Sequence, residues 1–179
     1  MNALTLRPRQ DADLPVLWRW CHAEENPEWM QWDGPYFDDK PQPISFEAYR
    51  EKAQAVTPDL NRQIIALNGE GIGMVSRYEE APTGGGWWEL GIVIYDPQHW
   101  GGGLGREALR QWTQRTFNET NAHVITLTTW SGNERMIRSA VRVGYRECAR
   151  IPEAREWQGR RWDSVKLALL RREWFRESP

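Results

Sequence analysis

Short apolar runs, bounded by polar, glycine or proline positions, alternate with stretches of helical spacing along the 179-residue chain. Runs rich in β-branched and aromatic residues predict strands, and apolar residues three or four positions apart predict helices. Strands are expected at residues 4–7, 62–67, 72–78, 87–95, 123–130, 145–157 and 161–170. Helices are expected at residues 11–21, 46–56, 104–117 and 131–143. No repeat and no linker interrupts this pattern, so one domain is expected over residues 1–179.

The most specific stretch is a glycine-rich loop between the central strand and the third helix. Gly101, Gly102, Gly103 and Gly105 follow the strand break at Asp96-Pro97. Glycine has no Cβ, so an anion can approach the backbone closely. The free N–H groups and the dipole at the start of the next helix also favour an anion. The loop is therefore predicted to bind a phosphate group, and a glycine-rich loop without a ligand is the alternative.

Two common phosphate-binding motifs do not fit this loop. A dinucleotide motif that starts at Gly101 requires glycine where Arg106 stands, and a Walker loop requires Gly-Lys after the four intervening residues. The motif that remains, Trp100 to Arg106, is called the glycine loop below. It resembles the pyrophosphate loop of the GNAT superfamily of acetyl-CoA-dependent N-acetyltransferases. Its Trp-Gly start is similar to the Rim-type branch, which acetylates ribosomal proteins, although most GNAT members have Gln or Arg in place of Trp100.

The resemblance covers nearly the whole chain and implies a fold. This is the α/β (α+β) GNAT fold in three layers, with about four helices on both faces of one sheet. The sheet is expected to be mixed, mostly antiparallel and six- to seven-stranded. The strand at residues 87–95 and the strand at 123–130 are expected to be a parallel pair that splays apart.

The resemblance also implies acetyl-CoA as a co-substrate whose acetyl group passes directly to a primary amine. The main chain at the end of the central strand is expected to bind the pantetheine arm, and the glycine loop the pyrophosphate. The expected cofactor contacts are Val93, Ile94, Tyr95, Trp100, Gly101, Gly102, Gly103, Leu104, Gly105, Arg106 and Asn133.

Asn133 is expected to contact the cofactor because its neighbours already explain the start of the fourth helix. Ser131 and Glu134 have the spacing of a capping box, which does not need Asn133. In GNAT proteins an Asn at this place binds the pantetheine arm, and a Gly-Phe pair ends the helix eleven residues later. Gly144-Tyr145 stands at that distance here.

Glu89 and Ser139 are the candidate catalytic residues. Glu89 is the one carboxylate in the central strand and would act as general base, although a free Glu is a weak base for an ammonium group. A solvent-facing strand residue or an ion pair is the alternative. Thr128 and Ala140 stand where GNAT members can have a catalytic Glu and Tyr. The departing thiolate would therefore take its proton from water or from Ser139.

An acidic, aromatic and proline-rich stretch at residues 24–43 is the candidate acceptor site. Its carboxylates and aromatic rings suit a cationic amine, whereas a solvated loop is the plain alternative. The candidate substrate-binding residues are Glu28, Trp29, Trp32 and Trp130. A polyamine, an aminoglycoside-like amine or a basic peptide N-terminus would each fit such a site.

Composition limits the remaining partners. A net charge of −2 and a pI near 6.0 give no support for nucleic-acid binding. The chain lacks the roughly 18-residue apolar run that spans a membrane, and its cysteines and histidines lack metal-ligand spacing. A cytoplasmic protein without a metal is therefore expected. Trp174 and Phe175 follow the last strand and would suit a homodimer contact.

Two alternatives to an enzyme remain open. A non-catalytic acyl-CoA-binding or ligand-sensing protein of the same fold would lack the catalytic Tyr and Glu, as this chain does. A binding domain for proteins or sugars would use the 12 tryptophans, but it would not need the glycine loop.

Overall fold

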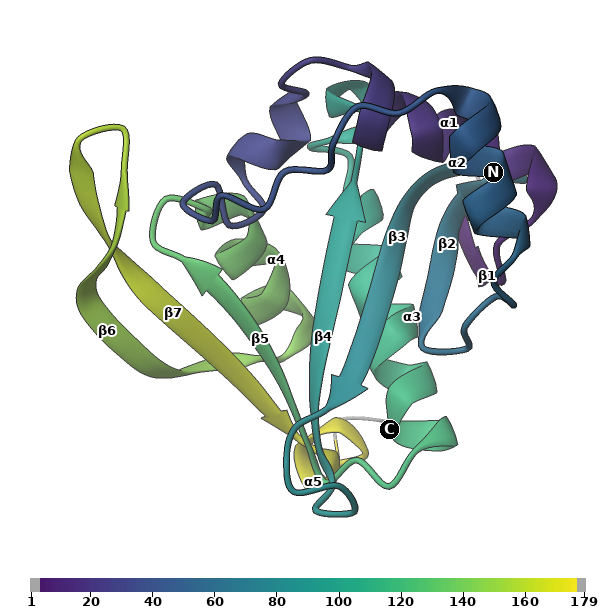
Figure 1. The fold of residues 1–179 in the computed structure, drawn as a ribbon. Coiled ribbons are helices and arrows are strands. Elements are labelled where there is room, and N and C mark those ends of the chain that lie inside the picture. Colours follow the sequence, from purple (N-terminus) through teal and green to yellow (C-terminus); the bar gives the residue numbers. More distant parts are fainter. Residues whose placement is uncertain (1–3, 177–179) are drawn as a thin grey trace.

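The computed structural model describes residues 4–176 and is built on one seven-stranded sheet in the order β1-β2-β3-β4-β5-β7-β6 (Figure 1). The strands are β1 (Leu4–Arg7), β2 (Arg62–Leu67), β3 (Glu70–Glu79), β4 (Trp87–Ile94), β5 (Val124–Trp130), β6 (Arg146–Trp157) and β7 (Arg160–Leu170). The helices are α1 (Leu14–Trp18), α2 (Phe46–Gln54), α3 (Leu104–Glu119), α4 (Glu134–Val143) and α5 (Arg171–Trp174). Short 3-10 turns occupy Asp11–Asp13, Glu28–Gln31 and Pro97–His99, and a π turn occupies Arg19–Ala23. The expected mixed sheet with helices on both faces is confirmed.

One pair of neighbouring strands, β4 and β5, is parallel, and this pair opens into a fork. The two strands are paired with each other over Trp87–Glu89 and Val124–Thr126. Beyond these residues β4 continues to Ile94 and β5 to Trp130 without pairing with each other. Figure 1 shows the two strands close together near α5 and far apart at their other ends. The expected splay is therefore present. Beyond it, backbone groups of β4 are left for another partner.

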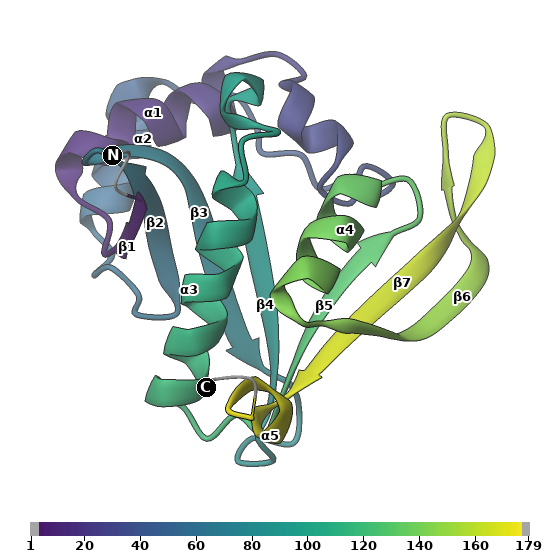
Figure 2. The same ribbon diagram turned by 180° about the vertical axis from the view of Figure 1, so that it is seen from behind.

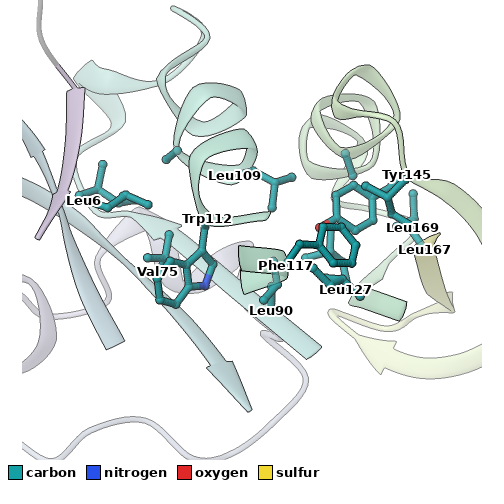
Figure 3. Close-up of a cluster of buried hydrophobic side chains, with 14 of the residues drawn as sticks. Leu6, Val75, Leu90, Leu109, Trp112, Phe117, Leu127, Tyr145, Leu167 and Leu169 are labelled. Carbon is teal, nitrogen blue, oxygen red and sulfur yellow. The ribbon is translucent and has the colours of Figure 1, made fainter. Parts of the chain in front are cut away.

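The main core lies between α3 and the sheet. Leu109, Trp112 and Phe117 project from α3 onto Val75 and Leu127 of the sheet (Figure 3). The Trp112 Nε1–H donates to the Ser76 carbonyl at 2.9 Å, so its one polar atom is satisfied. Burying side chains of this size stabilises the fold by about 1.5–3 kcal/mol each. This packing fixes the direction of α3, whose N-terminus carries the glycine loop.

A second cluster lies on the opposite face of the sheet. Neighbouring residues of a strand point to opposite faces, so Ile65 packs beneath α3 whereas Ile64 packs with Leu17 of α1. Figure 2 shows α3 and α4 together on one face, seen from behind the view of Figure 1. Helices α1 and α2 lie on the other face, where Leu17 and Tyr49 pack with Ile64.

The C-terminal aromatic residues lie against the chain's own helix α3. The Trp174 Nε1–H donates to the Gln114 Oε1 at 2.9 Å, and the Trp174 ring lies 6.4 Å from that of Phe117. Phe175 also packs on Phe117 and is 45% exposed. Trp174 therefore packs within its own chain and does not support the predicted homodimer contact.

The close approach of β3 and β4 depends on Gly73. A Cβ at this position would lie 2.2 Å from the Val93 carbonyl oxygen, so Gly73→Ala must push β4 away from β3. We expect a loss of at least ~1–3 kcal/mol in the free energy of unfolding, which thermal unfolding would detect as a lower Tm. Gly102→Ala, whose Cβ would meet no atom within 4 Å, is the control and should leave Tm unchanged. An unchanged Tm for Gly73→Ala would contradict the described β3–β4 packing.

Candidate active site

A cleft of about 870 Å³ occupies the fork. The ends of β4 and β5, the glycine loop, α4 and residues 29–39 form its walls. The predicted site residues that line it are Trp29, Trp32, Val93, Ile94, Trp100, Gly101, Gly102, Gly103, Gly105, Arg106, Trp130, Asn133 and Ser139. Glu28, Glu89, Tyr95 and Leu104 are not among the lining residues. The fork therefore brings together most, but not all, of the residues predicted from the sequence.

The glycine loop has the backbone geometry of an anion-binding site. Gly101 and Gly103 both have φ +83°, a left-handed conformation that side chains rarely adopt. Gly103 caps α3, and the first bond of the helix runs from the Glu107 N–H to the Gly103 carbonyl at 3.0 Å. The N–H groups of residues 104–106 thus precede the helical ladder. A Cβ at Gly101 or Gly102 would meet open space, so these glycines leave room beside the loop for a ligand.

The main chain of β4 presents alternate residues to the cleft. The Tyr95 N–H donates to the Ile72 carbonyl at 3.1 Å, and the Trp87 carbonyl accepts from the Glu80 N–H at 2.8 Å. Odd-numbered residues of β4 therefore bond to β3, and the even-numbered Ile92 and Ile94 face the cleft. The prediction was wrong in naming the main chains of Val93 and Tyr95. The predicted contact of the Ile94 main chain with the cofactor stays a prediction, and the Ile94 carbonyl accepts from the Trp100 Nε1–H at 2.9 Å.

Asn133 caps α4, contrary to the predicted capping box. Its Oδ1 accepts from the Met136 N–H at 3.3 Å, and its Nδ2 donates to the Trp32 carbonyl at 3.2 Å. The Ser131 hydroxyl instead accepts from the Asp163 N–H at 2.9 Å. The predicted Ser131 cap is wrong, and the Trp32 carbonyl, supplied by a distant segment, orients the Asn133 amide. The cofactor contact of Asn133 stays a prediction. Asn133 is thereby held in the wall of the cleft.

Glu89 lies at the base of the fork and outside the cleft lining. The Thr126 hydroxyl donates to its carboxylate, Lys166 Nζ lies 3.4 Å away, and Glu89 is only 6% exposed. Thr126 also accepts from the Trp87 Nε1–H at 2.7 Å. These contacts join β4, β5 and β7 at the last paired position. The ion-pair alternative is therefore the one observed, and this position does not support Glu89 as the general base.

Tyr145 is also outside the cleft. Its hydroxyl is hydrogen-bonded to Thr113 at 2.7 Å in the core, where burial raises its pKa. The Ser139 hydroxyl, by contrast, faces the cleft and forms no hydrogen bond with residues 4–176. Of the two hydroxyls, Ser139 is the one that can reach a ligand.

Four arginines line the cleft. Arg135, Arg138 and Arg142 come from α4, and Arg106 comes from the first turn of α3. The three arginines of α4 were not predicted, although their spacing of three and four residues on a predicted helix places them on one face. Arg106 belongs to the glycine loop and Arg135 contacts Trp100, so these two and the loop N–H groups make the glycine-loop end of the cleft positive.

Carboxylates and aromatic rings line the other end. Asp33, Asp39, Tyr36 and Phe37 come from the loop before α2, and Arg155 comes from the β6–β7 hairpin. The Arg155 guanidinium lies 4.8 Å from the Tyr36 ring centre and 5.1 Å from that of Phe37. This contact brings the hairpin against the loop, which no sequence pattern indicated.

Trp130 is the buried centre of this aromatic wall. Tyr36, Trp157 and Trp162 contact its ring edge-to-face at 6.2, 5.5 and 5.0 Å. Its Nε1–H donates to the Trp32 carbonyl at 3.1 Å. Two segments that are distant in sequence from Trp130, the loop at residues 32–36 and the β6–β7 hairpin, thus meet around one indole.

Asp33 is an unpaired carboxylate in the cleft. It forms no side-chain hydrogen bond or ion pair with the part of the chain that the structure describes. It remains open to solvent through the mouth of the cleft. The surrounding walls displace water and raise the pKa of its carboxyl, and the charge of Asp39 raises it further. A perturbed carboxylate in a cleft is typical of a functional site.

Buried polar atoms without a hydrogen-bond partner also occur in the cleft walls. Within residues 4–176 they are Trp32 Nε1, His99 Nδ1 and Arg155 Nε, and all three residues line the cleft. Such atoms are rare in folded proteins.

Between residues 4 and 176 there is no group of three metal-ligating side chains and no helix long and apolar enough to cross a membrane.

A cleft with a glycine-rich anion site at one end and a charged acceptor pocket at the other is typical of group-transfer enzymes. Residues 3–146 match the family model described as "Acetyltransferase (GNAT) domain". The chain therefore belongs to the GNAT acetyltransferase family, and it is an N-acetyltransferase that uses acetyl-CoA.

Relatives and solved structures agree with this family. The aminoglycoside N(6')-acetyltransferase type 1 of Klebsiella pneumoniae is 26% identical over 159 residues, which cover 80% of this chain and 74% of that protein. A GNAT acetyltransferase from Bacillus anthracis superposes with a TM-score of 0.74 at 18% identity, covering 97% and 100% of the two chains. A spermidine N-acetyltransferase from Vibrio cholerae, solved with CoA and spermine, superposes with a TM-score of 0.73 at 21% identity, covering 96% of this chain and 98% of that chain. At these identities the structures establish the fold alone.

The raised pKa of Asp33 has a consequence for stability. A carboxyl whose pKa is higher in the folded state binds its proton more tightly there, so ionising it above its ordinary pKa destabilises the fold. Asp33→Asn should therefore raise Tm at pH 7 and leave it unchanged at pH 3, where the carboxyl is protonated in both states. Thermal unfolding at the two pH values measures this. Asp38→Asn makes the same charge change outside the cleft lining and should have a smaller effect. Because Asp33 is exposed to solvent, the expected rise in Tm is small, and a lower Tm for Asp33→Asn at pH 7 would contradict an unpaired carboxylate with a raised pKa.

Proposed function

We propose that this protein transfers the acetyl group of acetyl-CoA directly to a primary amine of a small cationic molecule, in a ternary complex. One observation carries the proposal: a single cleft joins the positive glycine-loop end to the acidic and aromatic end. Two substrates of opposite charge can therefore meet in the fork. A cytoplasmic location fits both substrates.

The residues at the positive end fit acetyl-CoA. The N–H groups of residues 104–106 and the side chains of Arg106, Arg138 and Arg142 would hold its phosphates. The main-chain groups of Ile92 and the N–H of Ile94 would bond to the pantetheine arm as a neighbouring strand would, with Asn133 on the opposite wall. Bound acetyl-CoA supplies a thioester that an amine can attack.

Residues of the chain would then accept a proton from the amine and donate one to the departing thiolate. The amine adds as its neutral form, so that a nitrogen–carbon bond forms, the carbon–sulfur bond breaks and the nitrogen gives up a proton. Asp33 is the unpaired carboxylate of the cleft, and its raised pKa makes it a better proton acceptor than an ordinary Asp. The Ser139 hydroxyl or water would protonate the thiolate, which leaves readily because thiol pKa values are near ~8.5.

The acceptor is proposed to be a polyamine or an amino sugar. Asp33 and Asp39 favour a molecule with more than one ammonium group, since one amine can react while another stays charged and paired with a carboxylate. The names of the aminoglycoside and spermidine acetyltransferases describe acceptors of this kind. A peptide N-terminus, as for the ribosomal-protein-alanine N-acetyltransferase of Brucella melitensis, is the alternative acceptor. It would support the Rim-type branch.

A non-catalytic acyl-CoA sensor is the second candidate function. It is favoured by Ala140, which is buried and offers no proton donor, and by the position of Glu89 outside the cleft lining. Turnover separates the sensor from the enzyme.

The first test combines calorimetry with a thiol-release assay. Acetyl-CoA should bind with a Kd in the micromolar range typical of enzyme substrates. CoA should be released in the presence of a polyamine or an amino sugar. Peptides with a free N-terminus and simple monoamines complete the panel. Binding without release on any amine would support the sensor, and no binding would refute both candidates.

The second test concerns Asp39, the carboxylate of the cleft that is not the proposed proton acceptor. Asp39→Asn should lower kcat/KM for a diamine about 10- to 100-fold, the loss expected for a charge-assisted hydrogen bond of ~1.5–3 kcal/mol. The loss should be smaller for a monoamine of similar length. Asp38→Asn, which also removes one negative charge, should keep kcat/KM within about 2-fold. Equal losses for diamine and monoamine would refute recognition of a second ammonium.

A further inference from the structure

One arginine lies between two tryptophans that belong to opposite ends of the cleft. The Arg135 guanidinium is 4.1 Å from the ring centre of Trp100 and 4.7 Å from that of Trp32. Arg135 forms no ion pair within residues 4–176. Partial burial lowers the pKa of its guanidinium, and the negative charge of Glu28 opposes this shift. Contacts of this kind are favourable but weak enough to be remade.

Trp100 is part of the cofactor end. It directly precedes Gly101, and its Nε1–H donates to the carbonyl of Ile94, a residue that faces the cleft. A ligand that orders the glycine loop therefore also orders the Trp100 ring. This ring lies on one face of Arg135.

Trp32 is part of the acceptor end. It directly precedes Asp33, and its carbonyl accepts from the Trp130 Nε1–H and the Asn133 Nδ2–H. Its ring centre lies 4.7 Å from the same Arg135 guanidinium. The stack of Trp100, Arg135 and Trp32 is thus a direct contact between the glycine loop and the loop that carries the carboxylates.

We propose that Arg135 is a positioning residue that couples the two substrate sites. When CoA occupies the glycine loop, the ordered Trp100 ring holds Arg135, which in turn holds Trp32 and orders residues 28–37. The acceptor then binds to a preformed pocket, so each substrate tightens the binding of the other. This inference rests on the proposed function for its substrates, but its test does not require turnover.

The contrasting role for Arg135 is a direct phosphate ligand. The Arg135 guanidinium forms no hydrogen bond or ion pair within residues 4–176, so its N–H groups could also bind a phosphate. The two roles differ in one measurable respect. A phosphate ligand contributes to CoA affinity itself, whereas a coupling residue changes how residues 28–37 respond once CoA is bound.

Hydrogen exchange of the full chain, with and without saturating CoA, tests the coupling. In the wild type we expect CoA to slow amide exchange in residues 28–37 at least 5-fold, the lower end of typical coupling factors. In Arg135→Gln the slowing should fall below 2-fold, while calorimetry gives a CoA Kd within about 3-fold of wild type. Arg135→Lys keeps the charge but not the planar stack and should be intermediate. Arg138→Gln, a matched change on the same helix face, should weaken CoA binding yet keep the full slowing.

Three results would overturn the inference. These are unchanged slowing in Arg135→Gln, no slowing in the wild type at saturating CoA, or a more than 10-fold weaker CoA Kd for Arg135→Gln, which would make it a phosphate ligand. If CoA binds and slows exchange through Arg135 but no amine is acetylated, the proposed function fails and the coupling stands. If CoA does not bind, both fail.

Discussion

The site depends on the end of strand pairing between β4 and β5. Three paired positions close the sheet, Glu89, Thr126 and Lys166 hold the last pair together, and the two strands separate beyond it. A buried carboxylate is costly unless it is bonded, so this cluster fixes where the fork begins. The open backbone edge, the cleft and the relative positions of the two charged ends all follow from that point.

The cleft separates charge along its length. Backbone N–H groups and arginines from α3 and α4 surround one end, and carboxylates from the loop before α2 line the other. The overall charge of −2 gives no indication of this, because opposite charges on distant segments cancel in the sum. A polar gradient of this kind orients two oppositely charged substrates and favours their encounter.

The tryptophans have distinct structural roles. Trp112 fills the core under α3, and Trp130 forms the centre of the aromatic wall. Trp32 and Trp100 instead present their faces to Arg135. An indole combines a large apolar face with a single N–H donor, so it can pack, fix a distant carbonyl and stack on a cation. This explains why so many occur around one cleft.

The order of strands and helices and the glycine loop could be predicted from local periodicity and fixed spacing, and the family from the resemblance of that loop. Gly101, Gly103 and Arg106, which were predicted from the sequence, line the cleft. The surroundings of Glu89, Asn133, Asp33, Arg135 and Arg155 became apparent only in the folded chain. Their partners Lys166, Trp32 and Tyr36 come from segments distant in sequence. Whether a polar side chain is paired, capped or left open to a ligand depends on such partners, and a periodic pattern contains no information about them.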